Sequence, residues 1–296
     1  MPTLFCFGLG YTAAEYVANF HRRFERIFGT VRNSTRVDEM NREGKTWRTV
    51  LAFDGKSMSS EVRSAIASSD HVLVSVPPDA SGDFVLAACG TALSLAPRVR
   101  SVVYLSTIGV YGNHDGGWVD EESDCRPGAQ RSLQRRAAEH AWRDFGIRTG
   151  IPVAILRLAG IYGPGQNALV SLKNATARRI IKPGQIFNRI HVADIASAID
   201  AAFERRADGI FNVADDEPSP PEDPIAFAAE LLGIDAPPII PFSEAEASMS
   251  PFALSFYAEV KRARNDKLKS ELGISLEFRT YREGLTALRC QLPAGA

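Results

Sequence analysis

The sequence predicts an α/β protein in which a doubly wound parallel sheet carries a small C-terminal α+β lobe. Two observations support this prediction. Over the first half of the chain, short apolar runs alternate with longer helical patterns. The apolar runs also lack the polar–apolar alternation of a strand with one solvated face, and uninterrupted apolar strands are typical of parallel sheets covered by helices on both sides.

Six apolar runs predict strands, and the segments between them predict mostly helices. The expected strands are 3–8, 26–32, 47–54, 71–78, 101–107 and 152–163, the last with its exit loop. The expected helices are 12–24, 59–69, 83–96 and 130–146, whereas 33–46 is predicted only as a polar segment. Beyond residue 160 the pattern loosens, and we expect helices at 191–205, 224–233 and 265–273, a short strand at 209–215 and an extended stretch at 237–242. This looser half predicts a lobe over the carboxyl edge of the sheet.

Composition excludes several classes of protein. With 34 basic and 35 acidic residues the net charge is -1, whereas a dedicated nucleic-acid binder has a strong basic excess. No uncharged apolar run is long enough for a membrane span, and the first residues lack the basic start of a signal peptide. The four cysteines show neither C-x-x-C nor metal-ligand spacing. We therefore expect a cytoplasmic protein with reduced, buried thiols, no metal, and no nucleic-acid or membrane partner.

A glycine turn follows the first predicted strand. The stretch G-L-G-Y-T-A has Gly8, Gly10 and Ala13 at G-x-G-x-x-A spacing and opens a helix. The first glycine permits the tight turn, the second lets a pyrophosphate approach the backbone, and the small third residue allows close packing of helix on strand. We predict that this turn, including Tyr11 and Thr12, binds a dinucleotide; the alternative is a purely structural turn.

The end of the second strand bears on which dinucleotide is bound. Proteins that bind NAD carry an acid there for the ribose hydroxyls, but this strand continues G-T-V-R-N-S-T-R. Arg32 and Arg36 are suited to a 2′-phosphate, so the sequence predicts NADP, with NAD possible if both arginines are merely solvated. The other residues expected at the cofactor are Asp54 at the adenine edge, and Ser75, Val76 and Pro77 below the ribose and pyrophosphate.

Five motifs together carry a family resemblance. They are GLGYTA (8–13), YLSTIGVYG (104–112), LRLAGIYGPG (156–165), RIHVADIA (189–196) and IFNVADDEP (210–218). In this order and spacing the chain closely resembles the extended short-chain dehydrogenase/reductase superfamily, of the NAD-dependent epimerase/dehydratase type. The resemblance implies an NAD(P)-binding Rossmann domain at 1–160 and a substrate-binding lobe at 161–296, with 191–215 returning to the Rossmann sheet.

The resemblance also implies a catalytic site. Ser106 or Thr107 is the hydroxyl expected to bind a sugar-nucleotide or similar small substrate, and the family's Y-x-x-x-K motif is expected on the following helix. Counting onward gives Arg131 at the tyrosine position and Arg135 at the lysine position. Arg135 can still bind ribose hydroxyls, but a guanidinium remains protonated far above neutral pH, so Arg131 does not replace the proton donor.

Three interpretations follow from this departure. The first is an NADP-dependent enzyme of the epimerase or reductase type with a non-standard proton donor, for which Tyr111, Tyr162 and His191 are the candidates. The second is a non-catalytic protein that senses NADP(H) or binds a partner. The third, compatible with both, is a pocket in which Arg131 clamps an anionic substrate. Phe187-Asn188 stands where the family has Arg-Asp, which argues against nucleotide-diphosphate recognition. The resemblance further implies a possible homodimer through the helices after strands four and five.

Overall fold

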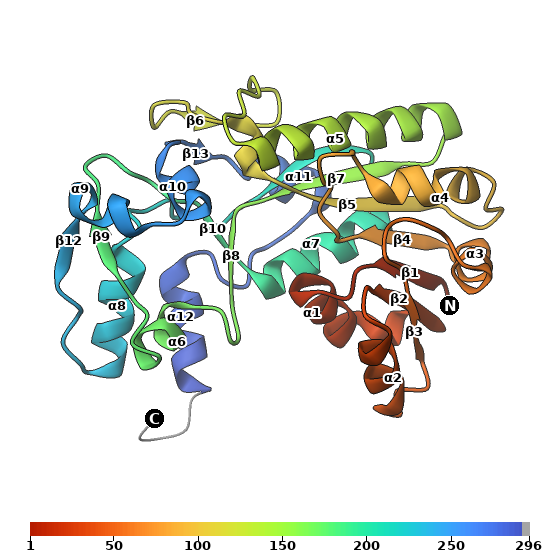
Figure 1. Cartoon of the computed structure of the whole chain (residues 1–296), viewed down its shortest axis with the longest axis horizontal. Coiled ribbons are helices and arrows are strands. Elements are labelled where there is room, and N and C mark those ends of the chain that lie inside the picture. The colour runs from red at the N-terminus through yellow and green to blue at the C-terminus, as the bar shows by residue number, and fades with distance from the viewer. Residues whose placement is uncertain (292–296) are drawn as a thin grey trace.

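The centre of the fold is a seven-stranded parallel sheet (Figure 1). The computed structural model describes residues 1–291. The strands lie in the order β11-β7-β5-β4-β1-β2-β3, and every neighbouring pair is parallel. They are β1 (Thr3–Phe7), β2 (Arg26–Val31), β3 (Arg48–Ala52), β4 (His71–Val74), β5 (Ser101–Thr107), β7 (Val153–Leu158) and β11 (Gly209–Val213). The predicted doubly wound α/β fold is confirmed.

The sheet is buried on both faces, as the uninterrupted apolar runs predict. All five residues of β1 are buried. Leu4 and Cys6 belong to one hydrophobic cluster, and Phe5 and Phe7 belong to another. Because successive side chains of a strand point to opposite faces, the two clusters are the cores on the two sides of the sheet.

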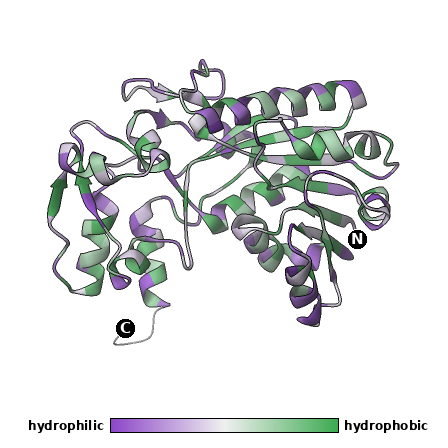
Figure 2. Cartoon of the chain, in the orientation of Figure 1, coloured by the Kyte–Doolittle hydropathy of each residue, from purple (hydrophilic) through white to green (hydrophobic). Residues whose placement is uncertain are grey.

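Helices cover each side. The cluster around Leu4 includes side chains of α1 (Tyr11–Phe20), α7 (Val192–Arg205) and α11 (Asp266–Leu272). The cluster around Phe5 includes side chains of α3 (Ser60–Ala67), α4 (Phe84–Ser94) and α5 (Gln130–Thr149). Figure 2 shows the resulting pattern of hydrophobic strands under helices that are more hydrophilic on their outer sides. Both faces of the sheet are therefore removed from water, which is the main stabilising contribution to such a fold.

A smaller lobe lies beside the carboxyl end of the sheet, on the left in Figure 1. Its helices α6 (Ala168–Lys173), α8 (Asp223–Leu232) and α12 (Tyr281–Cys290) enclose a separate cluster that contains Leu169, Ala228 and Leu285. The other elements of this region are β8 (Gly160–Tyr162), β9 (Arg179–Ile181), β10 (Arg189–His191), β12 (Ile239–Pro241), α9 (Phe242–Ala245) and α10 (Pro251–Tyr257). Two parallel pairs, β8 with β10 and β9 with β12, connect them.

Some local expectations were wrong. The polar segment 33–46 contains a helix, α2 (Ser34–Arg42), which has no buried residue and is stabilised at its start by Asn33, whose side chain accepts a hydrogen bond from the Thr35 amide. An apolar period cannot predict such a helix. Within 152–163 the expected strand is β7, and its expected exit loop contains a second short strand, β8. Only two of the four thiols are buried, because Cys125 is partly exposed and Cys290 is exposed.

Two further findings concern membrane spans and metal sites. No helix within residues 1–291 is long and apolar enough to cross a membrane. In the same residues, no group of three or more His, Cys, Asp or Glu side chains is arranged to hold a metal ion.

Candidate functional site

The turn after β1 requires glycine for two reasons. Gly8 has a φ of +86°, in the left-handed region that disfavours other residues. A Cβ at Gly8 would also lie 2.5 Å from Cγ1 of Val76, in the loop after β4. The Gly8 amide donates to Oγ1 of Thr30 on β2, 2.9 Å away. The turn is therefore held between two strands with no room for a side chain.

The start of α1, at Gly10, is not covered by other atoms. Gly10 is the N-cap of α1 and provides no side-chain cap, and a Cβ built there would meet no heavy atom within 4 Å. The first amides of a helix have no partner inside the helix, and together with the helix dipole they attract an anion. This uncapped, unobstructed helix start fits the pyrophosphate of a dinucleotide.

The other residues of the glycine turn have structural contacts. Ala13 is fully buried against the sheet, and Thr12 is buried beside it. The Tyr11 hydroxyl donates to the carbonyl of Pro164, 3.0 Å away, and so connects the turn to the loop after β8. The small side chain of Ala13, at the third position of the motif, thus allows α1 to pack closely against β1.

Two arginines stand near the end of β2 without acidic partners. Arg32 follows the strand, Arg36 lies in the first turn of α2, and both are exposed. Within residues 1–291 neither of them forms an ion pair. Asp54 follows β3, and the hydrogen bond from the Lys56 amide, 2.9 Å long, holds the pKa of its carboxyl below the usual value. Two cations and one carboxylate are therefore exposed to solvent near the ends of β2 and β3.

The loop after β4 lies against the glycine turn. The Ser75 amide donates to the Phe7 carbonyl over 3.0 Å, and Val76 contacts Gly8 as described above. Pro77 continues into the wall of a cavity. The segment 75–77 is thereby placed between the helix start of α1 and the cavity.

Arg135 lies where this loop meets β5. Its Nη1 donates to the Leu105 carbonyl over 2.8 Å and to the Tyr104 hydroxyl over 3.2 Å, and it lies 3.5 Å from the Val76 carbonyl. The side chain also lines the cavity. A guanidinium has five N–H donors in a fixed plane, so fixing Nη1 leaves the donors on Nε and Nη2 for a ligand.

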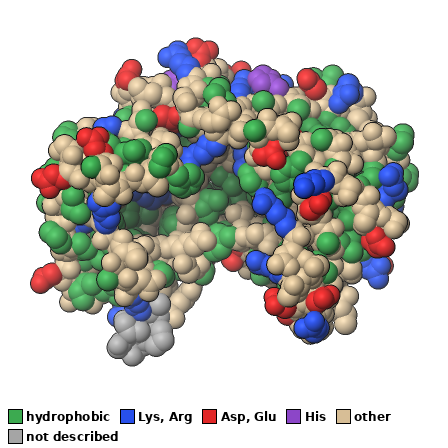
Figure 3. All heavy atoms as spheres, viewed as in Figure 1, with side chains coloured by type: hydrophobic (Ala, Val, Ile, Leu, Met, Phe, Trp, Pro, Cys, Tyr) green, Lys and Arg blue, Asp and Glu red, His purple; other side chains and the backbone are tan. Residues whose placement is uncertain are grey.

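The cavity has a volume of about 630 Å³ and lies between the sheet and the lobe. Residues 158–162 form its floor, α5 contributes Arg131, and the lobe contributes Phe187 and Phe256. Figure 3 shows this face of the molecule hollowed in the middle, with hydrophobic and basic side chains around the hollow. Its size matches that of small-molecule sites, which are mostly apolar with a few polar groups.

The structure separates the two hydroxyl candidates. Thr107 ends β5 and lines the cavity, and its Oγ1 accepts from the Gly109 amide over 3.0 Å. Ser106 points the other way, is buried, and donates to Oε1 of Glu139 over 2.6 Å. Because its hydroxyl is already bonded inside the protein, Ser106 does not face a substrate in this cavity, and Thr107 does.

The three neighbouring arginines of α5 have three different environments. The guanidinium carbon of Arg131 lies 4.2 Å from the ring centres of both Phe252 and Phe256 on α10, and partial burial lowers its pKa from the usual value. Arg135 is the cavity residue already described. Arg136 donates to Oε2 of Glu139 over 3.1 Å. Arg131 thus holds the lobe to α5 through cation–π contacts.

Glu139 also accepts from a buried arginine of β7. Nη2 of Arg157 lies 2.8 Å from Oε2, and Nε lies 3.1 Å from Oε1. The Arg157 guanidinium stacks at 4.7 Å on the ring of Tyr111, whose hydroxyl donates to Asn212 over 2.7 Å. The sequence candidate Tyr111 is therefore a buried member of this network.

The other two proton-donor candidates also have internal partners. Tyr162 borders the cavity, but its ring packs into the lobe core, its hydroxyl points to the Thr280 carbonyl at 3.4 Å, and burial raises its pKa well above the usual range. His191 caps α7 through the Ala193 amide, and burial lowers its pKa to about 4, so the ring is neutral. Both residues have structural roles in packing or capping.

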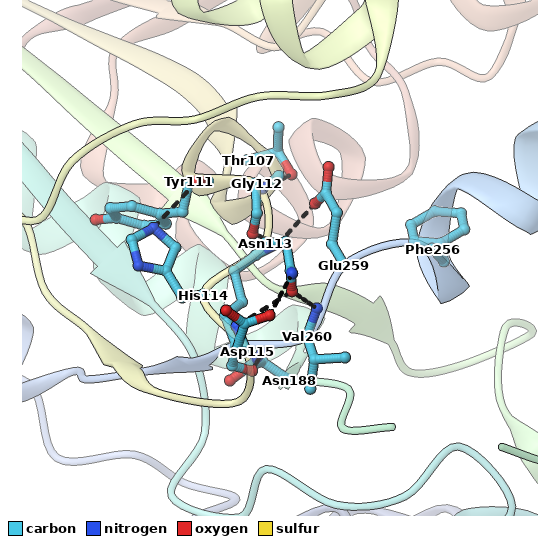
Figure 4. A network of polar contacts seen from close by, with 12 residues as sticks. Thr107, Tyr111, Gly112, Asn113, His114, Asp115, Asn188, Phe256, Glu259 and Val260 are labelled. Atoms are coloured by element: carbon cyan, nitrogen blue, oxygen red, sulfur yellow. Dashed lines mark hydrogen bonds and ion pairs between the residues drawn. The ribbon is translucent and has the colours of Figure 1, made fainter. Parts of the chain in front are cut away.

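Sequence reasoning missed one ionisable pair on the cavity wall. Lys261 and Glu259 follow α10 and both line the cavity. Nζ of Lys261 donates to Oε2 of Glu259 over 2.7 Å and to the Gly112 carbonyl over 3.0 Å. Figure 4 shows Glu259 and Gly112 beside the hydrogen bond from the Val260 amide to Asn113. Their segment has no motif, so only the fold brings it to the site, about 150 residues from Gly112 in the sequence.

Comparison with known proteins fits this geometry. The model of the NAD-dependent epimerase/dehydratase family matches residues 83–214. A structure of a functionally unknown conserved protein from Silicibacter pomeroyi is 42% identical, covers 99% of this chain and 100% of that chain, and has a TM-score of 0.86. The chain belongs to the NAD-dependent epimerase/dehydratase family. The family resemblance predicted from the sequence is thus confirmed.

Solved structures of lower sequence identity share the fold, and one curated protein matches part of the sequence. The dTDP-glucose 4,6-dehydratase of Bacillus anthracis, solved with NAD, is 15% identical over 98% of this chain and 96% of that chain, with a TM-score of 0.78. Human epimerase family protein SDR39U1, solved with NADPH, is 16% identical over 98% and 100%, with a TM-score of 0.73. A Streptomyces 3-diazoavenalumate denitrifying reductase is 28% identical over 139 residues, which cover 44% of this chain and 45% of that protein.

Proposed function

We propose that this protein is an NADP(H)-dependent reductase of small, largely apolar carbonyl compounds that carry an anionic group. The observation that carries the proposal is the cavity of about 630 Å³, which is lined by Pro77 of the loop that packs against the glycine turn before α1. The cavity wall combines aromatic and aliphatic side chains with the cations of Arg131 and Lys261. Reduction, as the reaction class, is supported by the Streptomyces relative, which is named as a reductase.

The preference for NADP rests on the end of β2. No acid stands there for the ribose hydroxyls, and Asn33 is occupied in capping α2. Arg32 and Arg36 are exposed and free of ion pairs within residues 1–291, so both are available to a 2′-phosphate. Hydrogen bonds between charged groups contribute about 1.5–3 kcal/mol each, enough to set the preference between two dinucleotides.

Each of the site residues has a proposed role. Gly8 allows the tight turn, Gly10 leaves room for the pyrophosphate, the segment 75–77 borders the ribose next to it, and Arg135 binds the nicotinamide ribose. Thr107 donates its hydroxyl to the substrate in the cavity. When bound, NADPH supplies the hydride for the substrate carbon. Residues 1–160 are the proposed cofactor domain and 161–296 the proposed substrate lobe.

The proposed substrate is not a nucleotide sugar. Phe187 and Asn188 occupy the family's Arg-Asp position and line the cavity, and Phe256 adds a second aromatic wall. These side chains suit a planar or aliphatic body better than a hydrated diphosphate. Arg131, held over two phenyl rings, is the proposed contact of the substrate's carboxylate.

A second candidate is a non-catalytic protein that binds NADP(H) and reports its level. The observation that favours it is Arg131 itself, because its contacts with Phe252 and Phe256 couple α5 of the cofactor side to α10 of the lobe. In that case cofactor binding changes the position of the lobe and no substrate is turned over.

Turnover distinguishes the two candidates. The full chain is incubated with NADPH and a panel of aldehydes and ketones with and without a carboxylate, and NADPH oxidation is followed by absorbance. The reductase proposal expects turnover of carboxylate-bearing apolar members, reduced when Arg131 is replaced by Met. Binding of NADPH without oxidation by any member of the panel contradicts it and supports the sensor.

A homodimer through α4 and α5 is also proposed. Leu133 and Ile147 of α5 are exposed large apolar residues, and α4 packs beside α5. Exposed apolar side chains on α5, beside α4, are suited to a partner surface. Light scattering during size-exclusion chromatography is expected to give twice the mass of one chain, and a monomeric mass contradicts the proposal.

A further inference from the structure

A reductase needs a group that hands a proton to the substrate, and the cavity wall offers few. Its arginines stay protonated, and its aliphatic hydroxyls, Thr107 among them, hold their protons too tightly at neutral pH. Tyr162 packs into the lobe core with its hydroxyl on a backbone carbonyl. Among the described residues that line the cavity, this leaves Glu259 and Lys261.

Lys261 is held with one donor to spare. An ammonium has three N–H bonds, and two of them are directed at Oε2 of Glu259 and the carbonyl of Gly112. The side chain of Lys261 is only 8% exposed, yet the residue borders the cavity. No third acceptor among residues 1–291 bonds to Nζ, so its remaining N–H is free for a group in the cavity.

The surroundings of Lys261 are suited to the release and return of a proton. Burial lowers the pKa of Lys261, while the carboxylate of Glu259 opposes that shift. The carboxylate of Glu259 also opposes the burial that lowers the pKa of Arg131, and both residues line the same cavity. Glu259 is 13% exposed and therefore gives the pair access to water.

We propose that Lys261 is the proton donor of this site, positioned by Glu259, in place of the family's tyrosine. The inference rests on the proposed reductase function. In the reductive direction an N–H bond of Lys261 breaks and an O–H bond forms at the substrate's carbonyl oxygen. The carbonyl carbon takes the hydride that NADPH supplies, and the neutral amine regains a proton from water by way of Glu259.

A purely structural clamp predicts different behaviour. Lys182 provides the comparison, because it too donates to a backbone carbonyl near α10, that of Tyr257, but it does not line the cavity. If Lys261 only ties the lobe to the core, Lys261→Met and Lys182→Met lower stability and leave the pH dependence of the reaction unchanged. If Lys261 donates the proton, only the first substitution removes that dependence.

The first test needs no turnover. The full chain is labelled at the lysine side chains, and the Lys261 resonance is assigned by its absence in Lys261→Arg and titrated by NMR, with and without cinnamate as an aromatic carboxylate probe. We expect a midpoint below the usual lysine pKa of about 10.4 and a shift of this resonance on adding cinnamate. A midpoint in the ordinary range, or a resonance that cinnamate does not move, overturns the inference.

The second test measures turnover of the carbonyl panel with NADPH. Lys261→Met is expected to lower kcat by about 10²–10⁴-fold, the usual contribution of a positioned acid, with NADPH affinity unchanged. Lys261→Arg keeps the charge but is expected to lose the fall in rate at alkaline pH, whereas Lys182→Met keeps both rate and pH profile. If the wild type reduces members of the panel and Lys261→Met is equally active, the inference about Lys261 is overturned and the proposed function stands. A wild type that binds NADPH but reduces nothing overturns the proposed function and the inference with it.

Discussion

The substitution Glu139→Gln tests the buried network beneath the site. Glu139 is fully buried and Arg157 is 1% exposed, and they share hydrogen bonds of 2.8, 3.1 and 3.3 Å. Glutamine keeps the shape of the side chain but removes the charge opposite Arg157, whose Nη1 already has no hydrogen-bond partner within residues 1–291. Breaking one side of a buried ion pair costs about 3–5 kcal/mol, because the other charge stays buried. At about 2 °C or more per kcal/mol, the midpoint of thermal unfolding should fall by roughly 6 °C or more.

Differential scanning calorimetry measures this loss against two controls. Arg136→Ala removes only a partly exposed i,i+3 partner of Glu139, and its cost should stay below about 1 kcal/mol. The double variant Glu139→Leu with Arg157→Met replaces both charges by apolar groups, and it should be less destabilised than either single variant. A Glu139→Gln protein that unfolds within about 1 °C of the wild type refutes the argument that this carboxylate compensates Arg157.

Three further predictions concern the site and its surroundings. Arg131→Ala removes a cation that contacts two phenyl rings, each contact worth about 0.5–1 kcal/mol, so amide hydrogen exchange in α10 should quicken while that of α12 stays unchanged. Unchanged exchange in α10 refutes this role of the contact. Burial raises the pKa of Asp215 to about 8, so the folded protein binds more protons than the unfolded chain between about pH 4 and 8 and loses stability as the pH rises. The thermal unfolding midpoint of Asp215→Asn, relative to that of the wild type, should therefore rise from pH 5 to pH 8. A difference that stays constant with pH contradicts this prediction. Thr107→Ala should weaken turnover or cinnamate binding with little change in the unfolding midpoint. Ser106→Ala should instead cost about 1 kcal/mol of stability, because its hydroxyl is bonded to Glu139. The reverse pattern contradicts the assignment of Thr107 as the cavity hydroxyl.

The sequence predicted the sheet well because its signal is local. In β1 and β5 the residues that enter the two cores form an almost uninterrupted hydrophobic run. Such a run predicts a strand buried on both faces without any knowledge of the neighbouring strands. The glycine turn was predictable for the same reason, since Gly8 and Gly10 act through their own backbone. In contrast, α2 buries nothing and depends on the cap at Asn33, so apolar periodicity does not indicate it.

The substrate side was less predictable because it depends on long-range contacts. The aromatic partners of Arg131 lie on α10, some 120 residues along the chain, and no spacing in the sequence pairs them. Lys261 meets Gly112 across 149 residues. The choice between Ser106 and Thr107 also needed the fold, since adjacent strand residues point to opposite sides and only the structure shows which side faces the cavity.

The measurement that tests the central claim most directly is the pair of dissociation constants for NADPH and NADH. Titration followed by fluorescence is made on the wild type and on Arg32→Glu. We expect the wild type to bind NADPH about 10- to 100-fold more tightly, and Arg32→Glu to lose most of that ratio through weaker NADPH binding, as one charge-assisted hydrogen bond of about 1.5–3 kcal/mol requires. Equal affinity for the two dinucleotides in the wild type, or binding of neither, contradicts the proposed cofactor site on which the proposed reaction depends.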